Sequence, residues 1–167
     1  FVVFLTVSAI PHHYLIAFLL FSAASYTDHL DGKIARKRKL ITNFGKFMDP
    51  LADKILVVSA LVCFLQMGLT NVWFVLIVIA REFMVTSIRL VAADSGIVIA
   101  ANRWGKAKTV SQIVAILVVI ALQYLRELLW AGSAVHEVGC YLIGEAFLLI
   151  CVLLTVVSGV IYLKQNW

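Results

Sequence analysis

The chain of 167 residues is 63% hydrophobic and only 14% charged, with a formal net charge of +5. Soluble domains are about 45–50% apolar, so this composition excludes an ordinary soluble domain. It indicates an all-α, polytopic membrane protein. The length leaves room for a single membrane domain, residues 1–167, and for no separate soluble one. The positive charge lies in short loops between apolar stretches, so it does not indicate a nucleic-acid partner.

Six apolar stretches predict six transmembrane helices, and all but the first are near the ~20 residues that cross a bilayer. The first stretch, 1–10, has neither a methionine nor a polar leader in front of it. We therefore expect a first helix that is truncated in this chain, with its beginning upstream. The other five predicted helices cover 12–37, 46–66, 71–93, 105–126 and 139–163.

Positive charges gather in alternate loops. They lie between the end of the second predicted helix and the start of the third, around the start of the fifth and at the end of the sixth: Lys37, Arg38, Lys39, Lys46, Arg103, Lys106, Lys108 and Lys164. The turn QMGLTN at 66–71, between the third and fourth helices, carries no charge. By the positive-inside rule, the basic loops are cytoplasmic. We expect a protein integral to the cell (cytoplasmic) membrane, with its active site near the cytoplasmic face.

Four aspartates stand out in the apolar chain, where carboxylates are costly and usually functional. They form two pairs, Asp28 with Asp31 and Asp49 with Asp53. Spacings of three and four place both members of a pair on one face of a helix. Four carboxylates that face one another need cations, and a site with oxygen ligands alone favours Mg²⁺, Mn²⁺ or Ca²⁺. Of these we expect Mg²⁺ or Mn²⁺. The pattern predicts a site for two ions that could hold a phosphoryl group.

Small and basic residues are interleaved with the first aspartate pair. Gly32 and Ala35 keep the helix thin enough for a ligand to approach the backbone, and Arg36 offers a bidentate fork for a pyrophosphate. The alternative is a salt-bridged pair of helices without a ligand, in which Lys33, Arg36 and Lys54 neutralise the acids. Four acids with this surface inside a membrane favour the functional interpretation.

The stretch resembles the signature of the CDP-alcohol phosphotransferase family. Its eight fixed residues are Asp28, Asp31, Gly32, Ala35, Arg36, Gly45, Asp49 and Asp53. The resemblance implies six transmembrane helices, two divalent metal ions, and attack of an alcohol on a CDP-linked lipid with release of CMP. It implies that the four aspartates are metal ligands and that Asp53 is also the general base. It further implies that Gly32, Ala35, Arg36 and Thr42 line the CDP moiety.

The acceptor alcohol must be recognised by other residues. Arg81 lies about 15 Å into the fourth predicted helix, a depth that requires a partner such as Glu82 or the aspartates. Arg89 lies two turns further towards the cytoplasm, and Lys106 and Lys108 lie near the start of the fifth helix. Such convergence favours a phosphorylated acceptor. Alone, the two lysines are ordinary positive-inside loop charges.

The combination of DPLADK at 49–54, AREF…R at 80–89 and GKAKT at 105–109 resembles the phosphatidylglycerophosphate-forming branch of the family. That resemblance implies transfer of a phosphatidyl group from CDP-diacylglycerol to glycerol 3-phosphate, among membrane lipids, and leaves open a homodimer. Two alternatives have the same donor chemistry, namely a cardiolipin synthase and a phosphatidylinositol phosphate synthase. A divalent cation transporter and a non-catalytic scaffold are alternatives of other classes.

Overall fold

We describe the protein from a computed structural model. The structure describes the backbone of residues 1–7, 10–38, 43–94, 103–129 and 134–166. Within these ranges it describes all side chains except those of 28–29, 31–38, 43–53, 93–94, 134–137 and 166.

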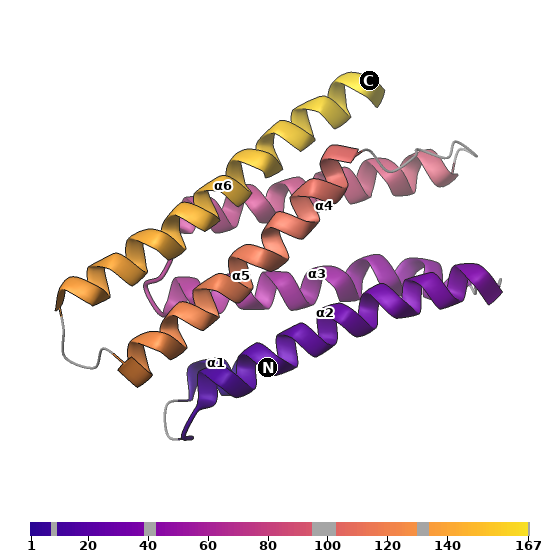
Figure 1. Cartoon of the computed structure of the whole chain (residues 1–167). Helices are drawn as coiled ribbons and strands as arrows, with labels where there is room; N and C mark the ends of the chain where they lie inside the picture. The colour runs from indigo at the N-terminus through magenta and orange to yellow at the C-terminus, as the bar shows by residue number, and fades with distance from the viewer. Residues whose placement is uncertain (8–9, 39–42, 95–102, 130–133, 167) are drawn as a thin grey trace.

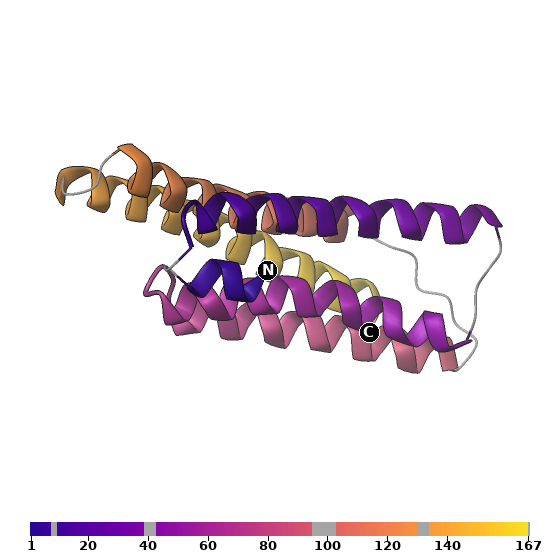
Figure 2. The ribbon, with the colours of Figure 1, turned by 90° about the horizontal axis from the view of Figure 1, so that it is seen from below.

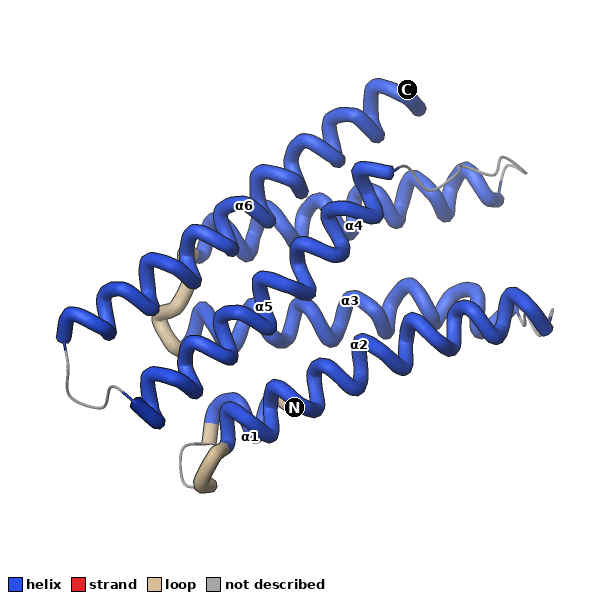
Figure 3. Tube along the Cα trace, in the orientation of Figure 1, coloured by secondary structure: helices blue, strands red, loops and turns tan. Residues whose placement is uncertain are grey.

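All regular structure in the described residues is helical (Figure 3). The helices are α1 (Val2–Thr6), α2 (His13–Arg38), α3 (Asn43–Gln66), α4 (Val72–Asp94), α5 (Arg103–Leu129) and α6 (Ala134–Asn166). The all-α class and the five longer predicted helices are confirmed, with ends that shift by a few residues. The first helix is shorter than the predicted stretch 1–10.

The turn between α3 and α4 is built from local sequence signals. Gly68 has a φ of +69° and accepts the left-handed conformation that ends many helices. Its backbone N–H donates to the carbonyl of Leu65 at 3.1 Å. Asn71 then caps α4, because its side-chain oxygen accepts a hydrogen bond from the N–H of Trp73 at 3.0 Å. The uncharged QMGLTN segment is therefore a tight helix–helix turn.

The long helices pack so that α5 and α6 lie against each other, α2 packs on α5, and α6 also crosses α4 (Figure 1). The view from below shows α3 and α4 side by side under α2 (Figure 2). Phe21 of α2 and Phe64 of α3 are fully buried, as is Ile116 of α5. The core therefore joins helices from both halves of the chain.

Large apolar side chains remain exposed along the helices, among them Val91 of α4, Val110 of α5 and Leu153 of α6. Helices α5 and α6 are long and apolar enough to cross a membrane over Arg103–Leu129 and Val138–Gln165, and shorter apolar helices cover His13–Thr27 and Lys54–Gln66. Apolar surface of this extent suits contact with lipid. The described helices are those of a membrane protein.

Candidate functional site

The four aspartates of the signature lie on two continuous helices. Asp28 and Asp31 belong to α2, and Asp49 and Asp53 belong to α3. The helical spacing assumed for each pair is therefore confirmed. Their side chains lie outside the described residues, so their convergence on two ions stays a prediction.

The contacts between CDP and the residues predicted to bind it also stay predictions. Gly32, Ala35 and Arg36 lie on the backbone of α2 in the last three turns of that helix. Their side-chain environment lies outside the described residues, as does all of Thr42. What the structure does describe is the region next to this motif, where α3, α4, α5 and α6 meet.

A group of partly or fully buried polar side chains lies there, which we call the Glu82 cluster: Lys54, Arg81, Glu82, Lys108 and Ser158. Its members come from α3, α4, α5 and α6. The side chains of Arg81 and Glu82 are 12% and 15% exposed, and that of Lys108 is 3% exposed. Such charges are buried only when they are paired or serve a function.

Glu82 is the common partner in this cluster. Its Oε1 accepts hydrogen bonds from Arg81 Nη1 at 3.0 Å and from Lys108 Nζ. Its backbone carbonyl accepts a hydrogen bond from Lys54 Nζ at 2.9 Å. The predicted partner for Arg81 is thereby confirmed as Glu82.

The crossing of α4 and α6 shapes the Arg81 side of the cluster. Arg81 Nη2 donates to Ser158 Oγ at 2.9 Å, and that hydroxyl donates in turn to the carbonyl of Thr155 at 3.0 Å. The neighbouring Gly159 leaves room for the aliphatic part of Arg81, since a Cβ there would lie 3.3 Å from Arg81 Cγ. Small residues in α6 thus allow a long cation to lie between two helices.

The cluster has more hydrogen-bond donors than acceptors. Three cations, Lys54, Arg81 and Lys108, surround one described carboxylate. Arg81 Nε is buried without a hydrogen-bond partner among the described residues, and so is Nε2 of Gln112, one turn after Lys108 on α5. Buried donors normally find acceptors. A ligand with several anionic oxygens would supply them.

The structure brings together only two of the four residues predicted to bind the acceptor phosphate. Arg81 and Lys108 come together through Glu82. Arg89 is exposed and lies over the ring of Tyr162 on α6, 5.5 Å from its centroid. Lys106 is exposed on α5, whereas Lys108 is only 2% exposed. Lys108 is therefore not an ordinary loop charge.

Sequence reasoning did not assign a site role to Glu82, Lys54 or Ser158. The signal for Glu82 was present, because an adjacent Arg–Glu pair in the middle of an apolar helix requires an explanation. Lys54 and Ser158 lie 28 and 76 residues from Glu82 in the chain. Only the packing of the helices brings them to it.

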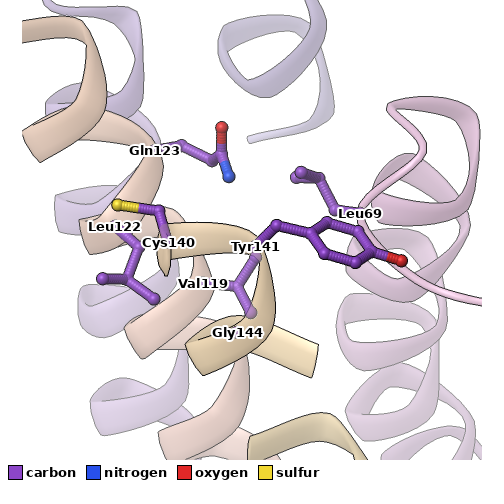
Figure 4. Close-up of a pocket in the computed structure, with 7 residues that line it drawn as sticks. All are labelled: Leu69, Val119, Leu122, Gln123, Cys140, Tyr141 and Gly144. Atoms are coloured by element: carbon purple, nitrogen blue, oxygen red, sulfur yellow. The ribbon is translucent and has the colours of Figure 1, made fainter. Parts of the chain in front are cut away.

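A pocket lies at the opposite end of α5 from Lys108. It is lined by Leu69, Val119, Leu122, Gln123, Cys140, Tyr141 and Gly144 (Figure 4). Its lining includes no charged side chain. This pocket offers nothing that would bind a phosphate or a metal ion.

The chain matches the CDP-alcohol phosphatidyltransferase family over residues 1–162. It therefore belongs to this family of transferases, and the resemblance seen in the aspartate signature is confirmed. The assignment favours group-transfer chemistry over cation transport.

Curated relatives resemble most of the chain. An enzyme of Bacillus subtilis (strain 168) named CDP-diacylglycerol–glycerol-3-phosphate 3-phosphatidyltransferase is 43% identical over 95% of this chain and 77% of its own length. A Rickettsia felis protein of the same name is 36% identical over 87% of this chain and 76% of its own length. A probable phosphatidylglycerophosphate synthase of Mycobacterium tuberculosis (strain H37Rv) is 36% identical, over 90% of this chain and 66% of its own length.

Proposed function

We propose that the protein transfers a phosphatidyl group from CDP-diacylglycerol to glycerol 3-phosphate, giving phosphatidylglycerophosphate and CMP. The reaction type is supported by membership of the family and by the printed names of the similar enzymes. The observation that carries the choice of acceptor is the donor-rich Glu82 cluster, which suits a phosphate group and not a neutral alcohol.

The aspartates suit two divalent cations, Mg²⁺ or Mn²⁺. The donor set is four carboxylates at helical spacing on α2 and α3, with no histidine or cysteine at the fixed positions of the signature. Asp28, Asp31, Asp49 and Asp53 would hold the ions. When bound, the ions would neutralise the pyrophosphate and the developing charge of the transferred group.

The chain's own residues then perform three tasks. Gly32, Ala35, Arg36 and Thr42 line the CDP moiety. Asp53 takes the proton from the acceptor hydroxyl, whose oxygen attacks the phosphorus that carries the diacylglycerol. A new P–O bond to the acceptor forms as the P–O bond to CMP breaks.

Basic residues bind the phosphate of the acceptor. In this proposal Lys108 and Arg81 lie deepest, while Arg89 and Lys106 lie towards the solvent and attract the anion. Arg89 is held against the ring of Tyr162, which limits its motion. Charge-assisted hydrogen bonds from such groups are about twice as strong as neutral ones.

The proposed orientation follows from the distribution of charge. The end of α2, the starts of α3 and α5 and the end of α6 carry the basic residues, and these helix ends point towards the same side of the bundle (Figure 1). We place this side in the cytoplasm and propose six transmembrane helices. A homodimer in the membrane is part of the same proposal.

A panel of acceptors tests this function. Purified protein is incubated with CDP-diacylglycerol and, separately, with glycerol 3-phosphate, inositol phosphate, phosphatidylglycerol or glycerol, and the lipid product and CMP are measured. We expect phosphatidylglycerophosphate from glycerol 3-phosphate alone. A larger yield with inositol phosphate or phosphatidylglycerol would assign the protein to a sister activity. Metal flux in liposomes without release of CMP would indicate a transporter.

A further inference from the structure

The most unusual feature of the cluster is the position of its acid. Glu82 contacts cations from three helices, through its carboxylate and through its own backbone carbonyl. A buried ion pair is a weak source of stability, because the cost of desolvating the charges offsets their attraction. Here Arg81 and Lys108 share the carboxylate of Glu82 while Lys54 bonds to its carbonyl, and two buried donors lack described partners. Glu82 therefore lies where it can hold several cations in position.

We propose that Glu82 is a positioning residue for the acceptor site, which holds the ammonium of Lys108 and the guanidinium of Arg81 where they receive the acceptor phosphate. This inference rests on the proposed function. Glu82 itself touches neither the phosphate nor the reacting atoms. It acts through Lys108 and Arg81.

The first argument is charge balance. With the four aspartates neutralised by two divalent ions, Lys54, Arg81 and Lys108 outweigh Glu82 by two positive charges. A phosphate monoester carries about −1.5 to −2 at neutral pH. The surplus therefore matches one acceptor phosphate. Without Glu82, the three cations would repel one another in a region of low dielectric constant.

The second argument is geometry. A lysine has a flexible stem and loses about 2 kcal/mol of rotamer entropy when it is held in place. Glu82 holds Lys108 before any ligand arrives, and it holds Arg81 together with Ser158. A ligand that meets groups already in position binds more tightly.

The third argument is the link to the predicted base. Lys54 directly follows Asp53 on α3, and its ammonium donates to the carbonyl of Glu82. Glu82 therefore connects the segment of α3 that carries the proton acceptor to the helices that carry the phosphate-binding cations. Nε2 of Gln112, one turn from Lys108 and without a partner among the described residues, provides a further donor on the same side of α5.

The test separates affinity for the acceptor from the amount of folded enzyme. In Glu82→Gln, we expect the KM for glycerol 3-phosphate to rise on the order of tenfold or more, since a displacement of about 1 Å can cost about a hundredfold. The KM for CDP-diacylglycerol should stay within about twofold. A structural role alone would lower kcat through loss of folded protein and leave both KM values unchanged.

The matched control is Glu145→Gln. Glu145 is an acid of α6 that interacts with Tyr141 one turn earlier, and it lies about 20 Å along the helix from Ser158. This variant should keep both KM values. An acceptor KM that rises equally in both variants would overturn the inference.

A double-mutant cycle tests whether Glu82 acts through Lys108. Lys108→Met removes the ammonium and keeps a flexible stem of similar length. Glu82→Gln should raise the acceptor KM by a smaller factor in the Lys108→Met background than in the wild type, because only its effect on Arg81 then remains. Effects that multiply would overturn the inference. The double variant also removes the Lys108 ammonium, which Glu82→Gln alone would leave buried without its carboxylate partner.

A binding measurement distinguishes failure of this inference from failure of the proposed function. Inorganic phosphate should raise the apparent unfolding temperature of the wild-type protein and not that of Glu82→Gln. If the wild type shows this effect but makes no product from glycerol 3-phosphate, the proposed function fails and the role of Glu82 stands. Equal stabilisation of both proteins by phosphate would overturn the role of Glu82 alone.

Should Glu82→Gln not fold, Glu82→Asp serves in its place, since it keeps the charge but shortens the reach by one methylene. A folded Glu82→Asp protein should show a raised acceptor KM and weaker stabilisation by phosphate. Wild-type values of both quantities would refute the positioning role.

Discussion

Replacing Gly159 with alanine tests whether the Arg81 stem is confined at the crossing of α4 and α6. A Cβ at this position would lie 3.3 Å from Arg81 Cγ and 3.9 Å from Met84 Cε. The stem of Arg81 cannot easily retreat, because its guanidinium is bonded to both Glu82 and Ser158. We therefore expect Gly159→Ala to strain the cluster.

The magnitude follows from a comparison with a second glycine of α6. At Gly139 a Cβ would meet no atom of the described residues within 4 Å. Alanine is favoured over glycine by about 1 kcal/mol in a helix interior, and this gain applies at both positions. Overpacking costs about 1–3 kcal/mol and applies at Gly159 alone. The Gly159→Ala protein should therefore be about 1–3 kcal/mol less stable than Gly139→Ala.

The assay is thermal unfolding of both variants in the same detergent, together with the acceptor KM. For a chain of this size about 1 kcal/mol corresponds to about 2–4 °C, so Gly159→Ala should unfold at least about 2 °C below Gly139→Ala. Its acceptor KM should also rise, because Arg81 is displaced. Equal unfolding temperatures would show that the stem of Arg81 is not confined, and the reasoning would be wrong.

Three further predictions concern the reaction. Asp53→Asn should lower kcat by at least about a hundredfold in a protein that still folds; wild-type turnover would exclude Asp53 as the base. EDTA should abolish CMP release, and either Mg²⁺ or Mn²⁺ should restore it; activity that persists in EDTA would refute the two-ion site. Arg89→Gln should raise the acceptor KM and change stability by less than about 1 kcal/mol, because Arg89 is exposed over Tyr162; an unchanged KM would remove Arg89 from the acceptor site.

The helices could be predicted from the sequence because their signals are local. Long apolar stretches separated by charged or glycine-containing segments match the thickness of a bilayer, and the structure has helices at all of them. Gly68 indicated the end of α3, because the turn that follows needs a positive φ and glycine adopts one without strain. The reaction class could also be predicted, since the signature from Asp28 to Asp53 lies on two consecutive helices and is recognised by its spacing along the chain.

The roles of individual lysines and arginines could not be predicted from such local signals. Lys106 and Lys108 are two residues apart and look alike in the sequence, yet one is exposed and the other is buried against Glu82. The difference arises because residues two apart point to different sides of a helix, and only the packing of α5 decides which side is inside. The sequence predicted both as ligands of one phosphate.

The sequence by itself determined the helical class, the family and the residues of the predicted metal site, because each depends on composition or on spacing within one segment. The tertiary structure decided the partners of the buried charges. Glu82 contacts Lys54 and Lys108 directly and is linked to Ser158 through Arg81. These contacts form only because four helices pack together. The physical reason is that the pairing of buried charges depends on distances between helices, which spacing along a single chain does not encode.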